Sequence, residues 1–544
     1  MNHLQRMIFV AALACSITTP ARAQTFDARI TIEADHPGAV ISPNIYGQFV
    51  EHLGRGVYEG IWVGPDSPIP NTRGIRNDVV SALRKIKVPL VRWPGGCFAE
   101  LYHWRDAIGP REQRPRGVNT AWGDEVETNQ FGTHEFMDFV EQIGAQPFIS
   151  VNLASGSPAE AQAWMQYLSG PAASGPGQER ARNGHQAPWK IPFIGVGNET
   201  WGCGGNMTAE HYSDVYRQYV SVLKPYGTLI ASDANSDDYA WTETLLTRAL
   251  FRHPPDMPTT LAYIGKQPQI GMISVHFYTF AGNDWANKSP AVGFGDAEWA
   301  AAMDRTWKTD ELISRHSAIL ERHDPDGKVG IAFSEWGAWW TTDPNRPSNL
   351  YQANTLRDAV IAGLTLNIFQ NHAARVRMAN LAQMVNVLQA LILTDKDRML
   401  LTPTYHVFDL YQGHQGATLL PARVTAPDYA LKAVKIPSLS ASASRANGVI
   451  SVSVVNLDPR RAANLQIDVQ GGRYSDAHGR VITAPTMDAR PAFDQPDALA
   501  PKALEGVHVR AGVVSLVAPA KSVLVLELRP TPLKTAGRDA AADH

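Results

Sequence analysis

Short apolar runs alternate with amphipathic stretches over most of the chain before residue 402. Eight runs have the length and the flanking turn residues of buried strands: 46–50, 89–93, 147–151, 193–196, 228–232, 272–275, 329–333 and 378–381. Helical periodicity separates most of them, at 77–87, 134–143, 209–223, 242–251, 312–322 and 351–369. Alternating strands and helices predict a parallel sheet. Eight repeats favour an α/β fold, a (β/α)8 TIM barrel with insertions, and a doubly wound open sheet is the alternative that periodicity does not exclude.

A different pattern begins near residue 402. Short segments there alternate or run apolar between turn residues, with weak helical periodicity, at 449–455, 465–469, 512–517 and 522–528. This pattern predicts a C-terminal antiparallel β-sandwich of jelly-roll type. Residues 28–34 also have the pattern of a strand, which we expect to pair with the sandwich. Residues 169–188 are rich in Gly, Pro, Ala and Ser and are expected to form a loop insertion.

The first 23 residues have the pattern of a secretory signal peptide. Arg6 precedes an apolar stretch at 7–15, and an A-x-A cleavage site follows at 21–23. The stretch is too short for a permanent anchor, and no later run approaches 18 apolar residues. We therefore expect export through a cleaved signal peptide and a periplasmic or secreted protein without a membrane span. Lipid modification at Cys15 is the alternative, with a weaker sequence match.

Together these patterns divide the chain into successive parts. The expected parts are a signal peptide at 1–23, an N-terminal strand within 24–41, a barrel at 42–401, a β-sandwich at 402–530 and a disordered tail at 531–544. We expect the sandwich to be a packing partner of the barrel. An independent carbohydrate-binding module is the alternative, but no row of exposed aromatic residues is evident in the sandwich.

Composition narrows the class of function. The 544 residues include 49 Lys+Arg and 52 Asp+Glu, so no basic excess indicates a nucleic-acid partner. Cys97 and Cys203 are the cysteines after residue 23, and they could form one bridge, which the sequence does not decide. CxxC, HExxH, P-loop and G-x-S-x-G motifs are absent, so we expect neither a metal nor an organic cofactor.

Two glutamates stand where a TIM barrel carries its active site, at the C-terminal ends of strands. Glu199 follows the fourth predicted strand and Glu335 the seventh, and these strands face each other across a small barrel. Cleavage of a glycosidic bond needs two carboxyl groups, one to protonate the leaving oxygen and one to attack the anomeric carbon or to activate water. Either glutamate alone would more often start a helix or pair with a cation. Each stands next to Gly and Trp, which favours the chemical interpretation.

Seven blocks of sequence carry a resemblance to a known family. They are IYGQFVEHLGRGVYEGIWVG (45–64), VRWPGGCFAELYHWRDAIGPREQRP (91–115), AWGDEVETNQFGTHEFMDF (121–139), GVGNETWGCGG (195–205), VHFY (275–278), FSEWGAWW (333–340) and ANLAQMVNVLQALILT (379–394). In this order they resemble glycoside hydrolase family 51, the α-L-arabinofuranosidases. The resemblance implies a retaining, exo-acting enzyme that removes terminal non-reducing α-L-arabinofuranosyl residues from arabinoxylan, arabinan and arabino-oligosaccharides. It also implies a barrel flanked by a sandwich that takes up the N-terminal strand.

The resemblance also assigns roles to residues. Glu199 matches the general acid/base and Glu335 the nucleophile. Residues expected to bind substrate are Glu51, Arg92, Cys97, Trp122, Asn198, His276, Tyr278, Trp339 and Gln383. Position 97 is Asn in some members and Cys in others, and a thiol is a weaker hydrogen-bond partner than an amide. A structural salt bridge is the alternative for Arg92, and a satisfied core residue is the alternative for His276.

Other functions remain open at this point. The same barrel could have β-xylosidase or endo-glucanase specificity. A non-catalytic carbohydrate-binding protein is the alternative from another class, and the presence of both carboxylates argues against it, because a binder needs neither. Family members are often homo-oligomers, but no pattern in the sequence indicates an interface.

Overall fold

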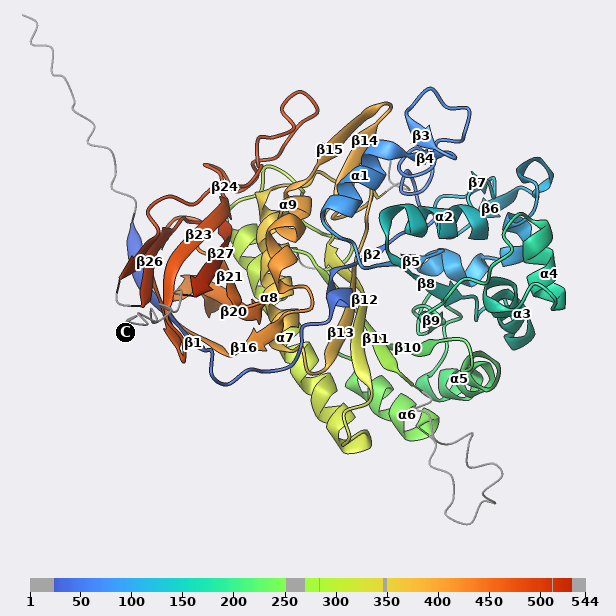
Figure 1. The fold of residues 1–544 in the computed structure, drawn as a ribbon, viewed down its shortest axis with the longest axis horizontal. Coiled ribbons are helices and arrows are strands. Elements are labelled where there is room, and N and C mark those ends of the chain that lie inside the picture. Colours follow the sequence, from blue (N-terminus) through green and yellow to red (C-terminus); the bar gives the residue numbers. More distant parts are fainter. Residues whose placement is uncertain (1–23, 251–269, 283, 346–349, 511, 531–544) are drawn as a thin grey trace, which may run out of the picture.

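The computed structural model describes residues 24–250, 270–282, 284–345, 350–510 and 512–530. Within them, parallel strands close into a barrel that helices surround, and two mainly antiparallel sheets lie beside it (Figure 1). The predicted fold class, a TIM barrel with a C-terminal β-sandwich, is confirmed. The segments predicted as signal peptide and disordered tail, 1–23 and 531–544, lie outside the described residues.

The barrel strands follow the order β10, β11, β12, β13, β2, β5, β8, β9 around the closed sheet. Their bounds are β2 Gly47–Phe49, β5 Leu90–Trp93, β8 Gln146–Val151, β9 Phe193–Val196, β10 Thr228–Asn235, β11 Met272–Thr279, β12 Gly330–Ala338 and β13 Val376–Leu381. All eight coincide with predicted runs. β11 and β12 extend beyond their apolar runs, because the polar residues His276 and Glu335 pair in the ladder after a shift of register that follows Ser274.

Apolar side chains fill the N-terminal half of the barrel interior. Each comes from one of the first three residues of its strand, and the cluster comprises Leu90, Phe148, Ile230, Met272, Ala332 and Met378. Polar side chains occupy the other half, at the C-terminal strand ends. The core therefore places the polar site on the face where TIM barrels carry their chemistry.

Helices cover the outside of the barrel (Figure 1). Their bounds are α1 Asn77–Lys85, α2 Thr133–Ile143, α3 Pro158–Ser169, α4 Gly175–Arg182, α5 Ala209–Leu223, α6 Tyr239–Ala249, α7 Asp296–His323, α8 Leu356–Asn371 and α9 Pro403–Leu410. Short 3-10 helices are η1 Pro43–Tyr46, η2 Cys97–Leu101, η3 Trp104–Ala107, η4 Arg111–Gln113 and η6 Tyr411–His414. Each predicted helical stretch overlaps one of these α-helices.

The predicted loop insertion at 169–188 is wrong, because α4 (Gly175–Arg182) lies within it. Ser174 caps the N-terminus of this helix with its hydroxyl. Arg180 is fully buried and donates a hydrogen bond of 2.7 Å to the carbonyl oxygen of Tyr167 on α3. Gly and Pro lower intrinsic helix propensity, so the cap and this tertiary contact decide the local structure.

The sandwich consists of two sheets, ordered β17-β1-β22-β26-β25 and β16-β20-β21-β27-β23-β24. Their bounds are β1 Thr25–Glu33, β16 Thr418–Leu420, β17 Ala422–Thr425, β20 Leu439–Ala446, β21 Val449–Asn456, β22 Ala462–Gln470, β23 Tyr474–Ile482, β24 Lys502–Ala503, β25 His508–Arg510, β26 Val513–Ala518 and β27 Ser522–Pro530. β1 pairs parallel with β22 and antiparallel with β17, so the start of the described chain lies in the C-terminal sandwich. The domain boundaries at 42 and 402 stay predictions.

α8 lies between the barrel and the sandwich and contacts β20, β21 and β27 (Figure 1). Residues Leu356 to Gln370 of this helix are all buried. At Gly363 an added Cβ would lie 3.0 Å from Val455 and 3.1 Å from Val523, both in the sandwich. The sheet therefore approaches the helix backbone closely at this glycine.

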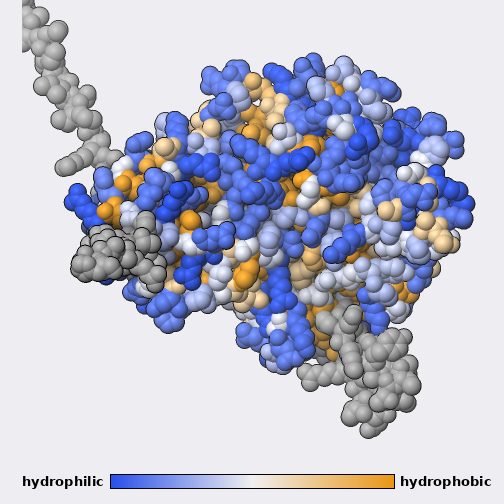
Figure 2. All heavy atoms as spheres, in the orientation of Figure 1, coloured by the Kyte–Doolittle hydropathy of each residue, from blue (hydrophilic) through white to orange (hydrophobic). Residues whose placement is uncertain are grey.

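Short hairpins project from the loops. They are β3 Asn71–Thr72 with β4 Ile75–Arg76, β6 Gly117–Asn119 with β7 Glu125–Glu127, β14 Ile392–Asp395 with β15 Arg398–Leu401, and β18 Asp428–Leu431 with β19 Val434–Pro437. Figure 2 shows hydrophilic residues over most of the visible face, with apolar residues in scattered groups. No helix among the described residues is long and apolar enough to cross a bilayer.

Candidate active site

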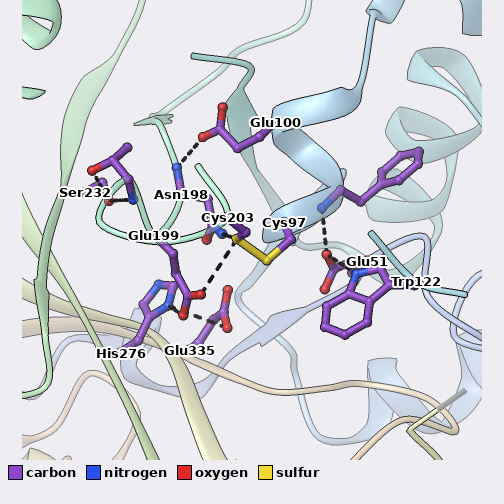
Figure 3. The surroundings of a disulfide bond; sticks show 12 residues. Glu51, Cys97, Glu100, Trp122, Asn198, Glu199, Cys203, Ser232, His276 and Glu335 are labelled. Carbon is purple, nitrogen blue, oxygen red and sulfur yellow. Dashed lines mark hydrogen bonds and ion pairs between the residues drawn. A yellow bond between two sulfur atoms is a disulfide. The ribbon is translucent and has the colours of Figure 1, made fainter. Parts of the chain in front are cut away.

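Glu199 and Glu335, predicted from opposite strands, meet at the C-terminal end of the barrel. Glu199 follows β9, Glu335 lies in β12, and His276 comes from β11. One ligand atom from each of the three side chains lies within 4.8 Å of the others. Figure 3 shows the two carboxylates turned toward one another beside the His276 ring. Two carboxyl groups are therefore available to one reacting centre.

Glu335 is buried and held by cationic and hydroxyl donors. Arg92 Nη1 donates to its Oε1 at 2.9 Å, and the Tyr278 hydroxyl donates to its Oε2 at 2.8 Å. The His276 Nδ1 lies 3.6 Å from Oε2. Burial by itself raises the pKa of Glu335, but the nearby His276 and Arg92 and these hydrogen bonds outweigh it and hold the pKa below its usual value. The carboxyl group is therefore kept ionised.

Glu199 is more open to solvent than Glu335, with 21% of its side chain exposed against 8%. His276 Nδ1 lies 2.9 Å from Glu199 Oε1, and His276 Nε2 lies 2.9 Å from Ser334 Oγ. The backbone φ of Glu199 is +41°, in the left-handed region that non-glycine residues seldom adopt. Contacts made by the neighbouring residues must therefore stabilise this backbone conformation of Glu199.

Arg92 connects the surroundings of both glutamates. Besides Glu335, its guanidinium donates to Asn198 Oδ1 at 2.6 Å, to the Ser334 carbonyl at 3.0 Å and to Ser150 Oγ at 3.2 Å. Its Cζ stacks 4.5 Å from the centre of the Phe49 ring. Arg92 therefore forms the buried salt bridge that was the alternative and also orients site residues, and its part in substrate binding stays a prediction.

Glu51 forms a second buried cluster beside the pair. Its Oε1 accepts hydrogen bonds from the Phe98 N–H at 3.0 Å and the Trp122 indole N–H at 2.9 Å, and its Oε2 accepts one from Gln383 Nε2 at 3.1 Å. Burial and, to a smaller extent, the charge of Glu335 raise the pKa of Glu51 to about 7. The structure thus brings together three of the predicted substrate-binding residues, Glu51, Trp122 and Gln383.

Trp339, another predicted ligand, packs edge-on to the Tyr278 ring with centroids 5.2 Å apart. Trp285 contacts both rings, at 5.2 Å from Trp339 and 6.2 Å from Tyr278, and it is 47% exposed. Sequence reasoning did not identify Trp285, because a single Trp in a polar stretch carries no pattern. An exposed indole beside the site is a platform on which a sugar ring can pack.

Cys97 and Cys203 form a disulfide bond beside the two glutamates (Figure 3), which resolves the pairing that the sequence left open. Cys203 Sγ lies 3.8 Å from Glu199 Oε2 and 3.6 Å from Asn198 Nδ2. Cys97 therefore has no thiol to offer a sugar hydroxyl, and its predicted part in substrate binding is limited to the sulfur surface and the backbone.

The Gly95-Gly96 pair before Cys97 is required by close packing. An added Cβ at Gly96 would lie 2.7 Å from Glu335 Oε1, and one at Gly95 would lie 2.8 Å from Glu51 Cγ. Only glycine lets the backbone of this loop approach both carboxylates.

Two more buried carboxylates near the site were also missed. Glu127 Oε2 lies 2.9 Å from His52 Nδ1, and the Trp93 indole N–H lies 3.1 Å from His52 Nε2. Glu100 accepts a hydrogen bond from the backbone N–H of Asn198, next to Glu199. Their partners are distant in the sequence, so no local pattern could have identified them.

Glu199, His276 and Glu335 also satisfy the spacing of a metal site within the described part of the chain. Arg92 already bonds the same carboxylate of Glu335, and a cation there would face its positive charge. His276 Nε2 is directed at Ser334. Hydrogen bonding and ion pairing therefore explain the cluster without a metal.

Two family models match the chain. The alpha-L-arabinofuranosidase 1 domain matches residues 82–279, and the alpha-L-arabinofuranosidase C-terminal domain matches residues 334–522. The "intracellular exo-alpha-L-arabinofuranosidase" of Bacteroides ovatus is 39% identical over 531 residues, covering 96% of this chain and 99% of that protein. Alpha-L-arabinofuranosidase C of Emericella nidulans is 31% identical over 466 residues, covering 82% and 88%.

Solved structures agree with these matches. The GH51 arabinofuranosidase from Xanthomonas axonopodis pv. citri is 44% identical and superposes with a TM-score of 0.88, covering 93% of this chain and all of that one (100%). The thermostable GH51 alpha-L-arabinofuranosidase from Thermotoga petrophila is 31% identical with a TM-score of 0.77, covering 92% and 100%.

The name of the Bacteroides ovatus relative overturns the predicted location of the protein. That relative, which matches almost the whole chain, is called intracellular, whereas the sequence pattern predicted a cleaved signal peptide and a periplasmic or secreted protein. The prediction of export rested on Arg6, an apolar stretch at 7–15 and an A-x-A site at 21–23, and so short a compositional pattern is not specific for export. The predicted export is therefore wrong.

Proposed function

Because this chain belongs to the α-L-arabinofuranosidases of glycoside hydrolase family 51, we propose that it is a retaining, exo-acting enzyme. It hydrolyses terminal non-reducing α-L-arabinofuranosyl residues of arabinoxylan, arabinan and arabino-oligosaccharides. Glu335 is the nucleophile and Glu199 the general acid/base. The observation that carries the proposal is the approach of these two carboxylates to within 4.8 Å, with His276 in contact with both.

The short separation supports retention of configuration. Carboxyl groups are about 5–5.5 Å apart in retaining glycosidases, and about 6.5–9.5 Å apart in inverting ones, which must hold a water between sugar and base. One oxygen of Glu199 lies within 4.8 Å of one oxygen of Glu335, which favours the shorter of the two separations. Direct attack by Glu335 on the sugar fits this geometry.

In the first step, an oxygen of Glu335 forms a bond to the anomeric carbon. The glycosidic bond breaks with its electron pair on the leaving oxygen, which takes the proton of Glu199, and an arabinosyl ester of Glu335 remains. Arg92 and Tyr278 support this role because they stabilise the ionised carboxylate before attack. His276 occupies Oε1 of Glu199, which leaves Oε2 to carry the transferred proton.

In the second step, Glu199 acts as the base. It takes a proton from a water whose oxygen attacks the anomeric carbon, and Glu335 departs as a carboxylate. Two inversions give net retention. Residues proposed to hold the sugar are Asn198, Glu51 and Gln383 through its hydroxyls, and Trp122 and Trp339 as walls of the pocket. The position of Asn198, directly before Glu199 and bonded to Arg92, supports contact with the sugar 2-hydroxyl.

Product stereochemistry tests the mechanism directly. Nitrophenyl α-L-arabinofuranoside is hydrolysed while NMR follows the first-formed anomer, and we expect the α-anomer before mutarotation. Early appearance of the β-anomer would contradict retention.

A panel of nitrophenyl glycosides tests specificity. Preference for a β-xyloside or a cellooligosaccharide would contradict the proposed arabinofuranosidase specificity. Unchanged activity after dialysis against EDTA is expected, because no step uses a metal.

The nucleophile is tested by Glu335→Ala. We expect turnover to be abolished and azide to restore part of it, because the small anion enters the space of the carboxylate and attacks the anomeric carbon. The product is then an arabinosyl azide of inverted configuration. Full activity of the variant without azide would refute the assignment.

A further inference from the structure

Glu100 is a buried carboxylate that the proposed reaction does not use. It lies in η2 (Cys97–Leu101) and is 1% exposed. Its Oε2 accepts hydrogen bonds from the backbone N–H groups of Leu153 at 2.6 Å and Ala154 at 2.7 Å. Its Oε1 accepts one from the N–H of Asn198 at 2.5 Å. One side chain thus joins the loops that follow β8 and β9.

The loop after β9 carries the proposed acid/base. Asn198, which Glu100 holds, directly precedes Glu199, whose backbone is in the left-handed region. Figure 3 shows the Glu100 carboxylate at the Asn198 nitrogen, on the side away from the Glu199 carboxylate. A charged acceptor bonds N–H groups more strongly than a neutral one. Glu100 is therefore well placed to hold the backbone conformation that directs Glu199 toward the substrate.

The rest of this loop is held by weaker or covalent contacts. Ser232 Oγ accepts from the Thr200 N–H at 3.3 Å, and the disulfide joins Cys203 to Cys97 on η2 itself. These contacts fix the loop after Glu199. Before Glu199, Arg92 holds the side chain of Asn198 through Oδ1, and Glu100 holds the backbone N–H of Asn198.

The charge of Glu100 has no role in an ion pair. Among the described residues Glu100 forms no salt bridge. Burial raises its pKa to about 7, although the three backbone hydrogen bonds and the charge of Arg92 act in the opposite direction. A neutral side chain would pack in this place at a lower free-energy cost. The Glu100 carboxylate instead accepts hydrogen bonds from three backbone N–H groups. Its function is therefore to order the loops that follow β8 and β9.

We propose that Glu100 is a positioning residue for Glu199, which orients the acid/base carboxyl toward the leaving oxygen through the backbone of Asn198. The inference rests on the proposed role of Glu199 as the general acid/base. Loss of Glu100 should affect some substrates more than others, because a misplaced proton donor matters most when the leaving group needs a proton.

The test compares Glu100→Gln with the parent enzyme on dinitrophenyl, nitrophenyl and phenyl α-L-arabinofuranosides and on an arabino-oligosaccharide. The glutamine amide presents N–H to backbone N–H, so at least one of the three hydrogen bonds is lost. We expect kcat/KM to change little on the dinitrophenyl substrate. On the phenyl substrate and the oligosaccharide it should fall at least about tenfold further, since acid assistance contributes about 10²–10⁴-fold.

Glu135→Gln is the matched control. Glu135 on α2 is also buried and accepts from a backbone N–H, that of Gly132 at 3.0 Å, and from Arg114 at 3.0 Å. It has no contact with the loop of Glu199. We expect this variant to lower thermal stability without a dependence on the leaving group. Should Glu100→Gln fold poorly, Glu100→Asp, which withdraws the carboxylate by one methylene, replaces it in the same comparison.

Glu199→Ala separates failure of this inference from failure of the proposed function. That variant is expected to lose far more activity on poor leaving groups than on the dinitrophenyl substrate. If it does so while the Glu100 variants lose activity equally on all substrates, Glu100 is only a structural residue and the inference is overturned. If Glu199→Ala itself shows no such dependence, the acid/base assignment fails first.

Discussion

Glu335 can stay ionised in a buried position because its neighbours replace the water it has lost. Arg92 carries a permanent positive charge at 2.9 Å, and Tyr278 donates a hydroxyl hydrogen at 2.8 Å. Glu51, only a short distance away in the site, has neutral donors alone, and burial raises its pKa to about 7. Two carboxyl groups of one site thus have opposite pKa shifts, because only Glu335 is in direct contact with a cationic side chain.

At this scale we predict the effect of Tyr278→Phe. The hydroxyl stabilises the ionised form of Glu335 and lowers its pKa, so its removal raises that pKa. In the proposed role of nucleophile Glu335 must be ionised, and the acid limb of the kcat/KM profile should therefore move to higher pH, by about one unit for a lost hydrogen bond to a charged group. The pH dependence of nitrophenyl arabinofuranoside hydrolysis measures this shift.

Tyr405→Phe is the control for the loss of a buried hydroxyl. Tyr405 donates to the Ala82 carbonyl at 2.8 Å, on the outside of the barrel. The acid limb should not move in this variant. An equal shift in both variants, or none in Tyr278→Phe, would show that Tyr278 does not set the pKa of Glu335.

At the scale of elements, the site depends on short segments that no single strand or helix supplies. η2 (Cys97–Leu101) follows β5 and approaches the loop after β9, and three kinds of contact join them: a disulfide, the Glu100 hydrogen bond and, through Arg92 of β5, a bond to Asn198. The barrel strands set the positions of these loops, and the contacts between the loops hold Asn198 and Glu199 in place.

The disulfide should stabilise the protein and its site together. It closes a loop of 106 residues, for which the chain-entropy model gives about 4–5 kcal/mol. We predict that a dithiol reductant, or the double variant Cys97→Ala/Cys203→Ala, lowers the thermal unfolding midpoint by several degrees and lowers kcat/KM. Scanning calorimetry and activity with and without reductant measure both effects. The double variant should not respond to reductant, and a parent enzyme equally insensitive to it would contradict the prediction.

At the scale of the whole molecule, the two parts share secondary structure and buried polar groups. β1 belongs to the sandwich although it precedes the barrel in the chain, and α8 is buried between both. Folding also buries several carboxyl groups. Burial raises the pKa of Glu51, Glu100 and Asp233 to about 7. These groups couple the stability of the fold to pH.

The sign of this coupling follows from proton binding. Asp233 has an ordinary pKa of 3.8, and in the folded protein the value is about 7. Between these values the folded state holds a proton that the unfolded state has lost, so stability from this group is present at low pH and is lost as the pH rises toward 7. The difference corresponds to about 4 kcal/mol at most.

We therefore predict that Asp233→Asn changes the pH dependence of unfolding. Asparagine does not titrate, so the midpoint of the variant should rise relative to that of the parent as the pH increases from about 5 to 8. Thermal unfolding at a series of pH values measures it. Asp326→Asn, at an exposed residue paired with Lys328, should show no comparable trend. A midpoint difference independent of pH would refute the prediction.

The local pattern of the sequence determined the barrel and the positions of the two glutamates. A strand buried in a parallel barrel is a short apolar run in any context, so the eight runs marked their strands without tertiary information. Position at the end of such a run then indicated the catalytic face. The same reasoning failed at α4, where a cap and the contact of Arg180 outweighed a composition rich in Gly and Pro.

Only the tertiary structure decided which distant residues share a contact. The disulfide joins positions 106 residues apart, Glu100 and Asn198 are 98 apart, and Trp285 reaches Trp339 from another loop. β1 likewise pairs with strands from the other end of the chain. Periodicity reports whether a residue is buried but not what it is buried against. The tertiary structure alone therefore decides which loops are in contact and how those contacts orient Glu199.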